Sequence, residues 1–453
     1  MKTRSLLMIL MISMISALNA QEKGKDVKSA VYRRSSIYTI ILDDAGLVHA
    51  DVIKDAFIQS PVPEKYNDHN LSVKSFDSKQ FPVTDADRAA IGAKKGKDKM
   101  GFAKMGKSIA NDATGGLVDT TATKDIPIQI EKFFKANKIG QRLVAKWFNR
   151  DDNGAFNMNL IGERGSWDAT EMAANVAKNS ARGTAMLSDA GEELIGNTFV
   201  VITRMKYVSK EEVMKAAKSV TSLAGKFGGT YGQLAEAAVN TAGDILSKGY
   251  VVQTYSYLYK LVWNDSVSAV FYQNLWQDNS KLDPARKMAF DTTSLFTLEY
   301  IGQEKAWADV QSTIFSKKSE DDLIRIATVN SVDAVIAKLQ TEYDVFKTKT
   351  PLYSANPLSA KIGLKEGLEK GDKFEVLEQT LDEKTNRTKY VRVGTISVEK
   401  DKIWDNRYMA AELLAEKAKD LPASEVNEQP PLDRTYFKGP DKFYSGMLIR
   451  QIK

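Results

Sequence analysis

The sequence predicts an α+β fold, in which a mixed sheet with packed helices is followed by a small all-β, barrel-like domain. Three observations predict it. Strand-like runs alternate with helix-like apolar stripes between residues 36 and 346. Short β-rich segments separated by glycines follow residue 351. The composition, 43% apolar and 27% charged among 453 residues, is that of a globular chain with more than one domain.

Residues 1–20 have the pattern of a signal peptide. Lys2 and Arg4 precede an apolar run at 5–17, and Ala20 stands before the polar stretch that starts at Gln21. The run is too short to span roughly 30 Å of hydrocarbon as a helix, so we expect cleavage rather than anchoring. The chain has no cysteine, which excludes a lipoprotein anchor and favours a bacterial envelope for an exported protein. We expect a periplasmic or outer-membrane-associated protein without a transmembrane helix after cleavage.

Residues 21–350 form the predicted α+β domain. Strands are predicted at 36–42, 71–76 and 156–161, and helices at 48–58 and 126–134; residues 140–148 fit either a helix or a strand. A capping-box pattern at Asp168 and Glu171 predicts a further helix, and a short one follows Ser188. The longest predicted helix is 320–346.

A lysine-rich segment interrupts this domain. Six lysines and a single acid, Asp98, lie between residues 94 and 107 among glycines, so we expect a mobile loop over 80–122. Lys94, Lys95 and Lys97 are candidates for contact with anionic lipid or lipopolysaccharide phosphates. The alternative is a solvated loop, which is the more common structure of such a segment. No nucleic-acid binding is expected, because aromatic side chains for base stacking are nearly absent from the segment.

A tyrosine-rich hairpin is the second predicted feature of this domain. Strands are predicted at 198–208, 250–263 and 267–276, with an Ala- and Gly-rich helical insertion at 209–249. Asn264 and Asp265 supply turn chemistry, so the last two strands should pair as an antiparallel hairpin. Tyr255, Tyr257 and Tyr259 would then share one face and could stack on sugar rings; the alternative is that they are ordinary sheet tyrosines.

Residues 351–453 form the predicted barrel-like domain. Pro351 and Pro357 mark its boundary, and strands are predicted at 373–379, 389–393, 395–399 and 443–449. Gly394 separates two of these strands.

No catalytic or metal-binding motif is found. The sequence has no phosphate-binding loop, no dinucleotide fingerprint and no Gly-x-Ser-x-Gly turn, and its two histidines lack ligand spacing. The calcium-loop-like start at Asn149 and Asp151 has Leu160 where the bidentate glutamate should be. We therefore predict no cofactor and favour a non-catalytic role, although 58 acidic residues leave a catalytic carboxylate pair open.

Glu163 and Arg164 are the best polar candidates. They follow an apolar segment and precede the helix predicted at Asp168. A buried arginine beside a carboxylate could recognise a polar ligand through hydrogen bonds. The alternative is a clamp that pins the following helix to the edge of the sheet, and such pairs are more often structural.

Two blocks resemble known envelope proteins. The order from Phe156 to Tyr207, with Glu163-Arg164, a capped helix and Asn197-Thr198 entering a strand, is similar to the envelope domain of curli-secretion-type proteins, shared with TolB-like amino-terminal domains (about 156–346). The block IGLKEGLEKGDKFEVLE from Ile362, with the later VGTISV, resembles the carboxy-terminal barrel of flagellar assembly protein T relatives (about 360–400). The chain lacks a lipobox cysteine and pore-forming strand pairs, so the resemblance implies scaffolding rather than a secretion pore.

These observations together predict an exported envelope protein that acts as an assembly, scaffolding or protein-interaction module, with other envelope proteins as partners. The alternative is an extracytoplasmic carbohydrate-binding or carbohydrate-active protein that uses the tyrosine-rich hairpin 250–276.

Overall fold

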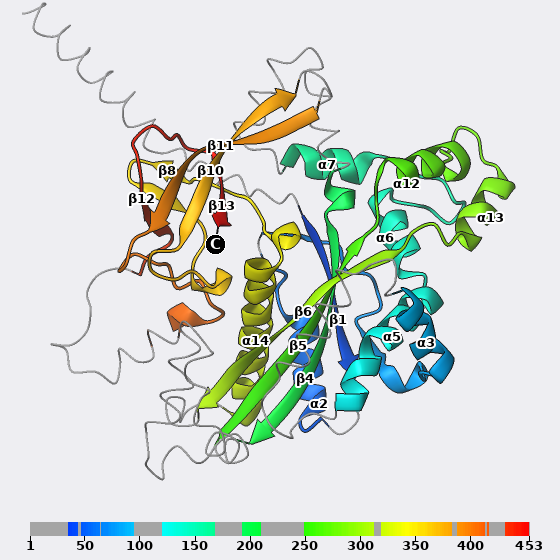
Figure 1. The fold of residues 1–453 in the computed structure, drawn as a ribbon, viewed down its shortest axis with the longest axis horizontal. Coiled ribbons are helices and arrows are strands. Elements are labelled where there is room, and N and C mark those ends of the chain that lie inside the picture. The colour runs from blue at the N-terminus through cyan, green and yellow to red at the C-terminus, as the bar shows by residue number, and fades with distance from the viewer. Residues whose placement is uncertain are drawn as a thin grey trace, which may run out of the picture.

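The computed structural model describes residues 35–43, 47–63, 65–94, 120–167, 193–209, 249–311, 319–382, 387–412, 415 and 431–452. Helices and two β-sheets fold as the sequence predicts for the α+β class. Figure 1 shows the larger sheet between two groups of helices, and the smaller sheet beside helix α14. The signal-like segment, the helix predicted at Asp168 and the insertion 210–248 lie outside the described residues.

The larger sheet is mixed, with the strand order β2-β1-β4-β5-β6, and β3 also pairs with β1. Strand β1 is parallel to β2, β3 and β4, whereas β5 is antiparallel to both of its neighbours, β4 and β6. Its strands are β1 (Ser36–Asp43), β2 (Asn67–Asp68), β3 (Ser75–Asp77), β4 (Thr198–Ser209), β5 (Gly249–Leu261) and β6 (Leu298–Gln311).

Helices cover both faces of this sheet. On one face lie α2 (Ala50–Gln59) and α14 (Glu320–Glu342). On the other lie α5 (Thr120–Ala136), α6 (Ile139–Trp147), α7 (Asn159–Trp167), α12 (Asp265–Val270), the π-helical turn η3 (Phe271–Leu275) and α13 (Pro284–Thr292). Two short elements precede α5: the 3-10 turn η1 (Ser78–Gln80) and α3 (Asp85–Lys94).

Strand alternation divides the core in two, because successive side chains on a strand point to opposite faces. On β5, Val252 and Leu258 contact the α2 and α14 side, whereas Tyr257 and Tyr259 contact the α5 and α6 side. Both sets are almost fully buried. The sheet is therefore apolar on both faces, and each face requires its own cover of helices.

Helix α14 is buried on nearly all sides. Ser319 caps its first turn, with the hydroxyl oxygen accepting a hydrogen bond from the Asp322 amide at 3.2 Å. A seam of small polar residues lets the helix approach the sheet closely, and the Thr254 hydroxyl donates to the Ser331 hydroxyl at 2.8 Å. The prediction of a long helix is confirmed, but the helix ends at Glu342 and the separate 3-10 turn η4 (Asp344–Phe346) follows it.

The smaller sheet has seven strands in the order β7-β13-β10-β11-β12-β9-β8, and all pairings are antiparallel. It curls around its own apolar cluster, which includes Phe374, Val376 and Ile396. The elements are β7 (Thr350–Pro351), β8 (Ser354–Ala355), β9 (Leu358–Ala360), the 3-10 turn η5 (Leu364–Glu366), β10 (Lys373–Asp382), β11 (Arg387–Val398), β12 (Thr435–Lys438) and β13 (Leu448–Ile452).

The predicted tyrosine hairpin does not form. Residues 267–276 are helical rather than a strand, because the Asn264 side chain accepts a hydrogen bond from the Val267 amide at 3.0 Å and so caps α12. Strand β5 instead pairs with β4 on one side and with β6 on the other.

Two further predictions in the first half are wrong. Residues 156–161 are not a strand: the Asn157 side chain accepts from the Asn159 amide at 3.1 Å, and α7 begins there. The predicted loop 80–122 contains α3, because Thr84 and Asp87 exchange capping hydrogen bonds at its start, and it contains the first turn of α5. The rest of that loop, 95–119, lies outside the described residues.

Other boundaries also differ from the predictions. The strand predicted at 71–76 is reduced to β3, and residues 140–148 are helical in α6. The strands predicted at 389–393 and 395–399 are a single strand, β11, because Gly394 accommodates a register shift instead of ending the pairing. The Phe443 ring packs where a Cβ on Gly394 would lie. The strand predicted at 443–449 begins only at Leu448.

Strand β6 is an edge of the larger sheet, and α14 caps that edge. The Tyr343 hydroxyl accepts from the Gln303 amide and donates to the Gln303 carbonyl, both at 3.1 Å. The Lys338 ammonium donates to the Lys305 carbonyl at 2.9 Å. Side chains of α14 and the turn after it thus take hydrogen-bonding positions that an added strand would use.

Helix α14 also contacts the smaller sheet. Asp333 on α14 pairs with Lys365 on η5 at 3.5 Å, and both side chains are largely buried. Burial raises the pKa of Asp333 to about 6, with Lys365 opposing the rise. The two halves of the protein therefore meet at an ion pair in which burial opposes the ionisation of the Asp333 carboxyl group.

The substitution Gly302→Ala tests the capped edge. A Cβ at Gly302 would lie 2.2 to 2.3 Å from atoms of the Tyr343 ring and would displace it. We expect the free energy of unfolding, measured by urea denaturation, to fall by about 1–3 kcal/mol. The control is Gly162→Ala in α7, where a Cβ meets nothing within 4 Å and stability should hold or rise. Equal losses in both variants would contradict the capping interpretation.

The substitution Asp333→Asn tests the buried ion pair. The folded pKa of about 6 lies above the ordinary value of 3.8, so the contribution of Asp333 to the stability of the wild-type protein rises as the pH falls from 6 towards 4. Asparagine does not titrate. The stability of the variant relative to wild type should therefore decline over this pH range, by roughly 1.4 kcal/mol per unit of pKa shift. Denaturation at pH 7.5 and 4.5 measures it, with the exposed Asp321→Asn as control; a relative stability that rises in acid would refute the account.

Candidate functional site

Arg164, one of the two polar candidates from the sequence, lies on α7 and reaches the edge of the larger sheet. Its Nη1 donates to His69 Nδ1 at 3.1 Å, its Nη2 donates to the Asp68 carbonyl at 3.0 Å, and its guanidinium lies 4.7 Å from the Trp147 ring centroid. Arg164 thereby joins α7 itself to strand β2. The helix predicted at Asp168, which the clamp interpretation concerns, lies outside the described residues, so that interpretation stays a prediction. Glu163 is exposed on the same helix.

His69 is fully buried and neutral. Its ring stacks on Trp147 at 4.5 Å, and Nε2 lies 3.0 Å from the Leu143 carbonyl oxygen. A carbonyl only accepts and a guanidinium only donates, so Nε2 carries the proton and Nδ1 accepts from Arg164. Burial lowers the pKa of His69 to about 3, and Arg164 and Lys146 add to this effect.

Two more cations, from α6, hold the loop that follows β2. The Lys146 ammonium donates to the Asn70 carbonyl at 2.5 Å, and Arg142 Nη2 donates to the Ser72 hydroxyl at 2.7 Å. Positions 142 and 146 are four apart on a helix and so share a face. Lys74 lies at the end of the same loop. We call Lys74, Arg142, Lys146 and Arg164 the cationic cluster.

The cationic cluster gathers side chains from three segments around one loop. Asp68 is the acid that acts on both Lys74 and Lys146. The described contacts of Arg142, Lys146 and Arg164 with this loop go to carbonyls, a hydroxyl and a neutral imidazole. Burial lowers the pKa of Lys146, and Arg164 and Lys74 lower it further by repulsion.

The two-stranded end of β10 and β11 is a second candidate surface. Strand β13 pairs with β10 only from Lys373 to Leu377, and β12 pairs with β11 only at Ser397 and Val398. Residues 378–382 and 387–391, with Arg392 at their base, continue as a ribbon that projects from the barrel (Figure 1), which we call the arm. Its exposed side chains include Val391, at 41% exposure, and the cations Lys389 and Arg392. Within the described chain, no strand continues the sheet beside the outer part of β11.

The three candidate tyrosines offer no sugar-stacking face. Tyr257 and Tyr259 are 1% exposed, and Tyr255 is half-buried in the same cluster. The Phe134 ring of α5 packs edge-on against Tyr259 at 4.9 Å. The tyrosines lie on the face that α5 and its neighbours cover, so they belong to the core.

The structure does not test the three candidate lysines as a site. Lys94 is the last residue of α3, and Lys95 and Lys97 lie outside the described residues. The positive charge that the structure does gather is the cationic cluster, which sequence reasoning missed apart from Arg164. The spacing of Arg142 and Lys146 could have indicated it, had residues 140–148 been assigned as a helix from the sequence.

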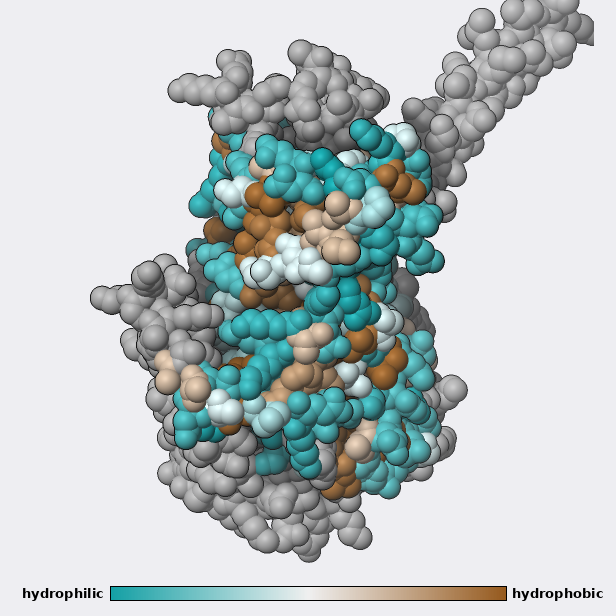
Figure 2. All heavy atoms as spheres, turned by 90° about the vertical axis from the view of Figure 1, so that its right-hand side faces the viewer, coloured by the Kyte–Doolittle hydropathy of each residue, from teal (hydrophilic) through white to brown (hydrophobic). Residues whose placement is uncertain are grey.

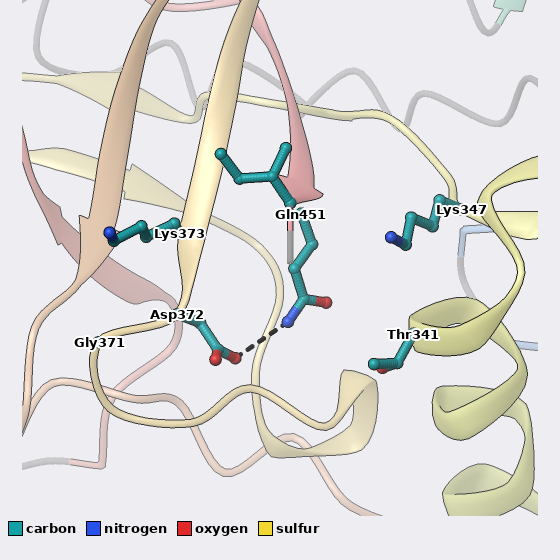
Figure 3. A pocket seen from close by; sticks show the side chains of 7 residues that line it. Thr341, Lys347, Gly371, Asp372, Lys373 and Gln451 are labelled. Carbon is teal, nitrogen blue, oxygen red and sulfur yellow. Dashed lines mark hydrogen bonds between the residues drawn. The ribbon is translucent and has the colours of Figure 1, made fainter.

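A pocket of about 360 Å³ lies between the end of α14 and the smaller sheet; it is lined by Thr341, Lys347, Gly371, Asp372, Lys373, Gln451 and Ile452. Figure 3 shows Thr341 and Lys347 on one wall, and Asp372 and Gln451 on the other. Asp372 accepts from Gln451 at 3.0 Å, and Lys347 pairs with Asp344 at 2.7 Å. Burial raises the pKa of Asp372. These charged groups already have partners within the chain.

The opposite end of the molecule presents apolar side chains. Figure 2 views this side, and apolar residues gather on its upper half, where α12 and α13 lie. Met288 is 68% exposed, and Leu282 and Val270 are also exposed. Beneath them lies an aromatic cluster that includes Phe271, Trp276 and Phe290.

Within the described ranges, no group of three or more histidine or acidic side chains could hold a metal ion. None of the helices in those ranges combines the length and apolarity needed to cross a membrane.

No protein-family model matches the chain, and no curated protein matches it. The resemblance to curli-secretion-type and flagellar assembly proteins therefore stays a prediction.

The substitution His69→Gln tests the neutral imidazole. In the unfolded chain His69 takes up a proton near pH 6.5, whereas the folded pKa is about 3. The wild-type protein should therefore lose stability from this group as the pH falls from 6.5 towards 3, by roughly 1.4 kcal/mol per pH unit. Glutamine keeps a donor for Leu143 and does not titrate. The variant should be less stable at pH 7.5, because the ring stacking is lost, and the gap should narrow by pH 5. A gap in unfolding free energy that stays constant would count against the assigned protonation state.

Proposed function

We propose that this protein is exported and acts in the bacterial cell envelope as a non-catalytic assembly or scaffolding module that binds other proteins. The charged and apolar parts of residues 1–20, the absence of cysteine and the two envelope-protein resemblances support export and the envelope class.

The arm is the observation that carries the protein-binding part of the proposal. An exposed edge strand can pair with an extended segment of another protein through main-chain hydrogen bonds. Folded proteins usually block such edges, and α14 does so at β6 through Tyr343 and Lys338. In contrast, β12 and β13 stop short of the arm and leave exposed Val391 on its surface. We take this difference to mark the arm as the contact surface.

The loss of the tyrosine hairpin weakens the carbohydrate alternative. Tyr257 and Tyr259, which would have stacked on sugar rings, are core residues.

A photo-crosslinking amino acid at Val391 tests the role of the arm. We expect a specific crosslink to another envelope protein in intact cells. An excess of wild-type protein without the crosslinking group should compete for this partner and reduce the crosslink, whereas an excess of the Val391→Asp protein should not. The matched position is Met288, which is more exposed at 68% and lies on the far side of the larger sheet. Crosslinks of equal yield and identity from both positions would indicate nonspecific contact.

Cell fractionation followed by amino-terminal sequencing tests export. The expected product is found outside the cytosol and begins near Gln21. Material that retains Met1 and stays in the cytosol would overturn this part of the proposal without affecting the arm.

A further inference from the structure

We propose that the arm binds an extended segment of its partner protein in which an acidic residue lies beside Arg392 and Lys442, at the base of the arm. This inference rests on the proposed function, because it takes the arm as the contact surface, and it adds the chemistry of the segment that the arm binds. Three features of the structure lead to it: an open position beside β11, two cations at the inner end of that position, and an apolar patch next to them.

The open position lies beside β11, in line with β12. Strand β12 pairs with β11 at Ser397 and Val398, and its last residue is Lys438. The chain contacts β11 again at Lys442, whose ammonium donates to the Val393 carbonyl at 2.7 Å. Beyond this contact, towards the tip of the arm, no strand in the described ranges pairs with the free side of β11. A segment that adds here through main-chain hydrogen bonds therefore has its inner end at Lys442.

Two cations flank that inner end. Arg392 is exposed, and its Nη2 donates to the Thr395 hydroxyl at 2.7 Å. Lys442 is also exposed, and its ammonium contacts the carbonyl of the residue that directly follows Arg392. Both acceptors are neutral, and within the described chain neither cation forms an ion pair, although Asp441 precedes Lys442 in the sequence. A carboxylate at the inner end of an added segment thus lies next to two cations that can donate charge-assisted hydrogen bonds to it.

An apolar patch fixes the position of the acid within the segment. Val391 is 41% exposed and lies opposite Glu378 in the ladder between β10 and β11. Partial burial and the charge of Glu378 raise the pKa of Tyr444, which is 46% exposed, so Tyr444 and Glu378 are neighbours. Paired residues share a face of a sheet and successive residues alternate between faces. A segment that packs an apolar side chain against Val391 therefore directs the next side chain to the face of Arg392.

Glu378 adds a restriction on the same pattern. Its carboxylate lies on the Val391 face, so an acidic side chain on that face would be repelled, whereas an acid on the Arg392 face would be attracted. The segment that suits the arm therefore has an apolar residue with an acidic residue directly beside it.

A second copy of this chain does not meet this requirement. Residues 387–393 carry Arg387, Lys389 and Arg392 and no acid. Pairing two such strands edge to edge would bring like charges next to each other, which is unfavourable across a ladder. Basic side chains protect an edge strand from self-association in this way, while the same charges favour an acidic segment of another protein.

Selection from a library of displayed random octapeptides tests the chemistry of the segment without naming a partner in advance. The purified protein serves as bait, and the Val391→Asp protein removes peptides that bind elsewhere. The expected peptides carry Asp or Glu directly beside an apolar or β-branched residue, and their binding should weaken as salt rises. The inference is overturned if no peptide depends on the arm, or if the arm-dependent peptides have no excess of acidic residues.

A charge exchange tests the role of the two cations. By fluorescence anisotropy, Arg392→Glu and Lys442→Glu should each weaken the binding of a selected acidic peptide about tenfold, because each replaces an attraction with a repulsion. Lys281→Glu, at an exposed lysine between η3 and α13, makes the same change in net charge and should bind as wild type does. The peptide whose acid is replaced by lysine should bind Arg392→Glu more tightly than it binds the wild-type protein, which also shows that the variant is folded.

Equal losses in Lys281→Glu and in the two arm variants would overturn the inference, as would a lysine peptide that gains nothing from Arg392→Glu. The failure of the proposed function is separate. A crosslink from Val391 to a partner segment without acidic residues would overturn the inference and leave the proposed function standing. The absence of any crosslink in cells would overturn the proposed function, whereas the peptide measurements decide the chemistry of the arm on their own.

Discussion

The structure depends on one constraint: the larger sheet is apolar on both faces, and α14 must cover one of them while also meeting the smaller sheet. Apolar side chains of β4 and β5 alternate between the faces, so neither face can be left to solvent. Helix α14 is therefore an interior helix with contacts on nearly all sides. The seam at Thr254 and Ser331 and the pair between Asp333 and Lys365 show how polar groups are accommodated on such a helix.

Buried ionisable side chains are accommodated in two different ways, as a neutral group and as an ion pair. His69 remains neutral, since its two ring nitrogens have fixed and opposite hydrogen-bonding roles. Asp333 remains paired with Lys365, although burial favours its neutral form. The cationic cluster differs from both, because its cations hold one loop through neutral acceptors. In the pocket near the end of α14, Lys347 and Asp372 have partners of their own.

The fold class and the strands β1, β4 and β5 could be predicted from the sequence, because period-two alternation over eight or more residues is a strong signal. The 14-residue strand β6 and the short β2 were not predicted. Two strands were predicted wrongly because asparagine side chains cap helices at these positions. Asn264 begins a helix where turn chemistry was expected, and Asn157 does the same before α7. The candidate site was only partly predictable: Arg164 stood beside an acid in the sequence, but Lys74, Arg142 and Lys146 join it only through tertiary packing. The sequence could not decide between a binding surface and the core for Tyr257 and Tyr259, because alternation places them on one face without telling which elements cover it.

The phenol of Tyr343 and the ammonium of Lys338 have a consequence for behaviour at high concentration. A long, straight border of a β-sheet is a template on which identical molecules can polymerise. Here the main-chain positions at Gln303 and Lys305 are already occupied by side chains from the same molecule. The addition of a strand from a second molecule is thereby obstructed at this border of the larger sheet. Fibril growth through this edge is therefore opposed even at high protein concentration.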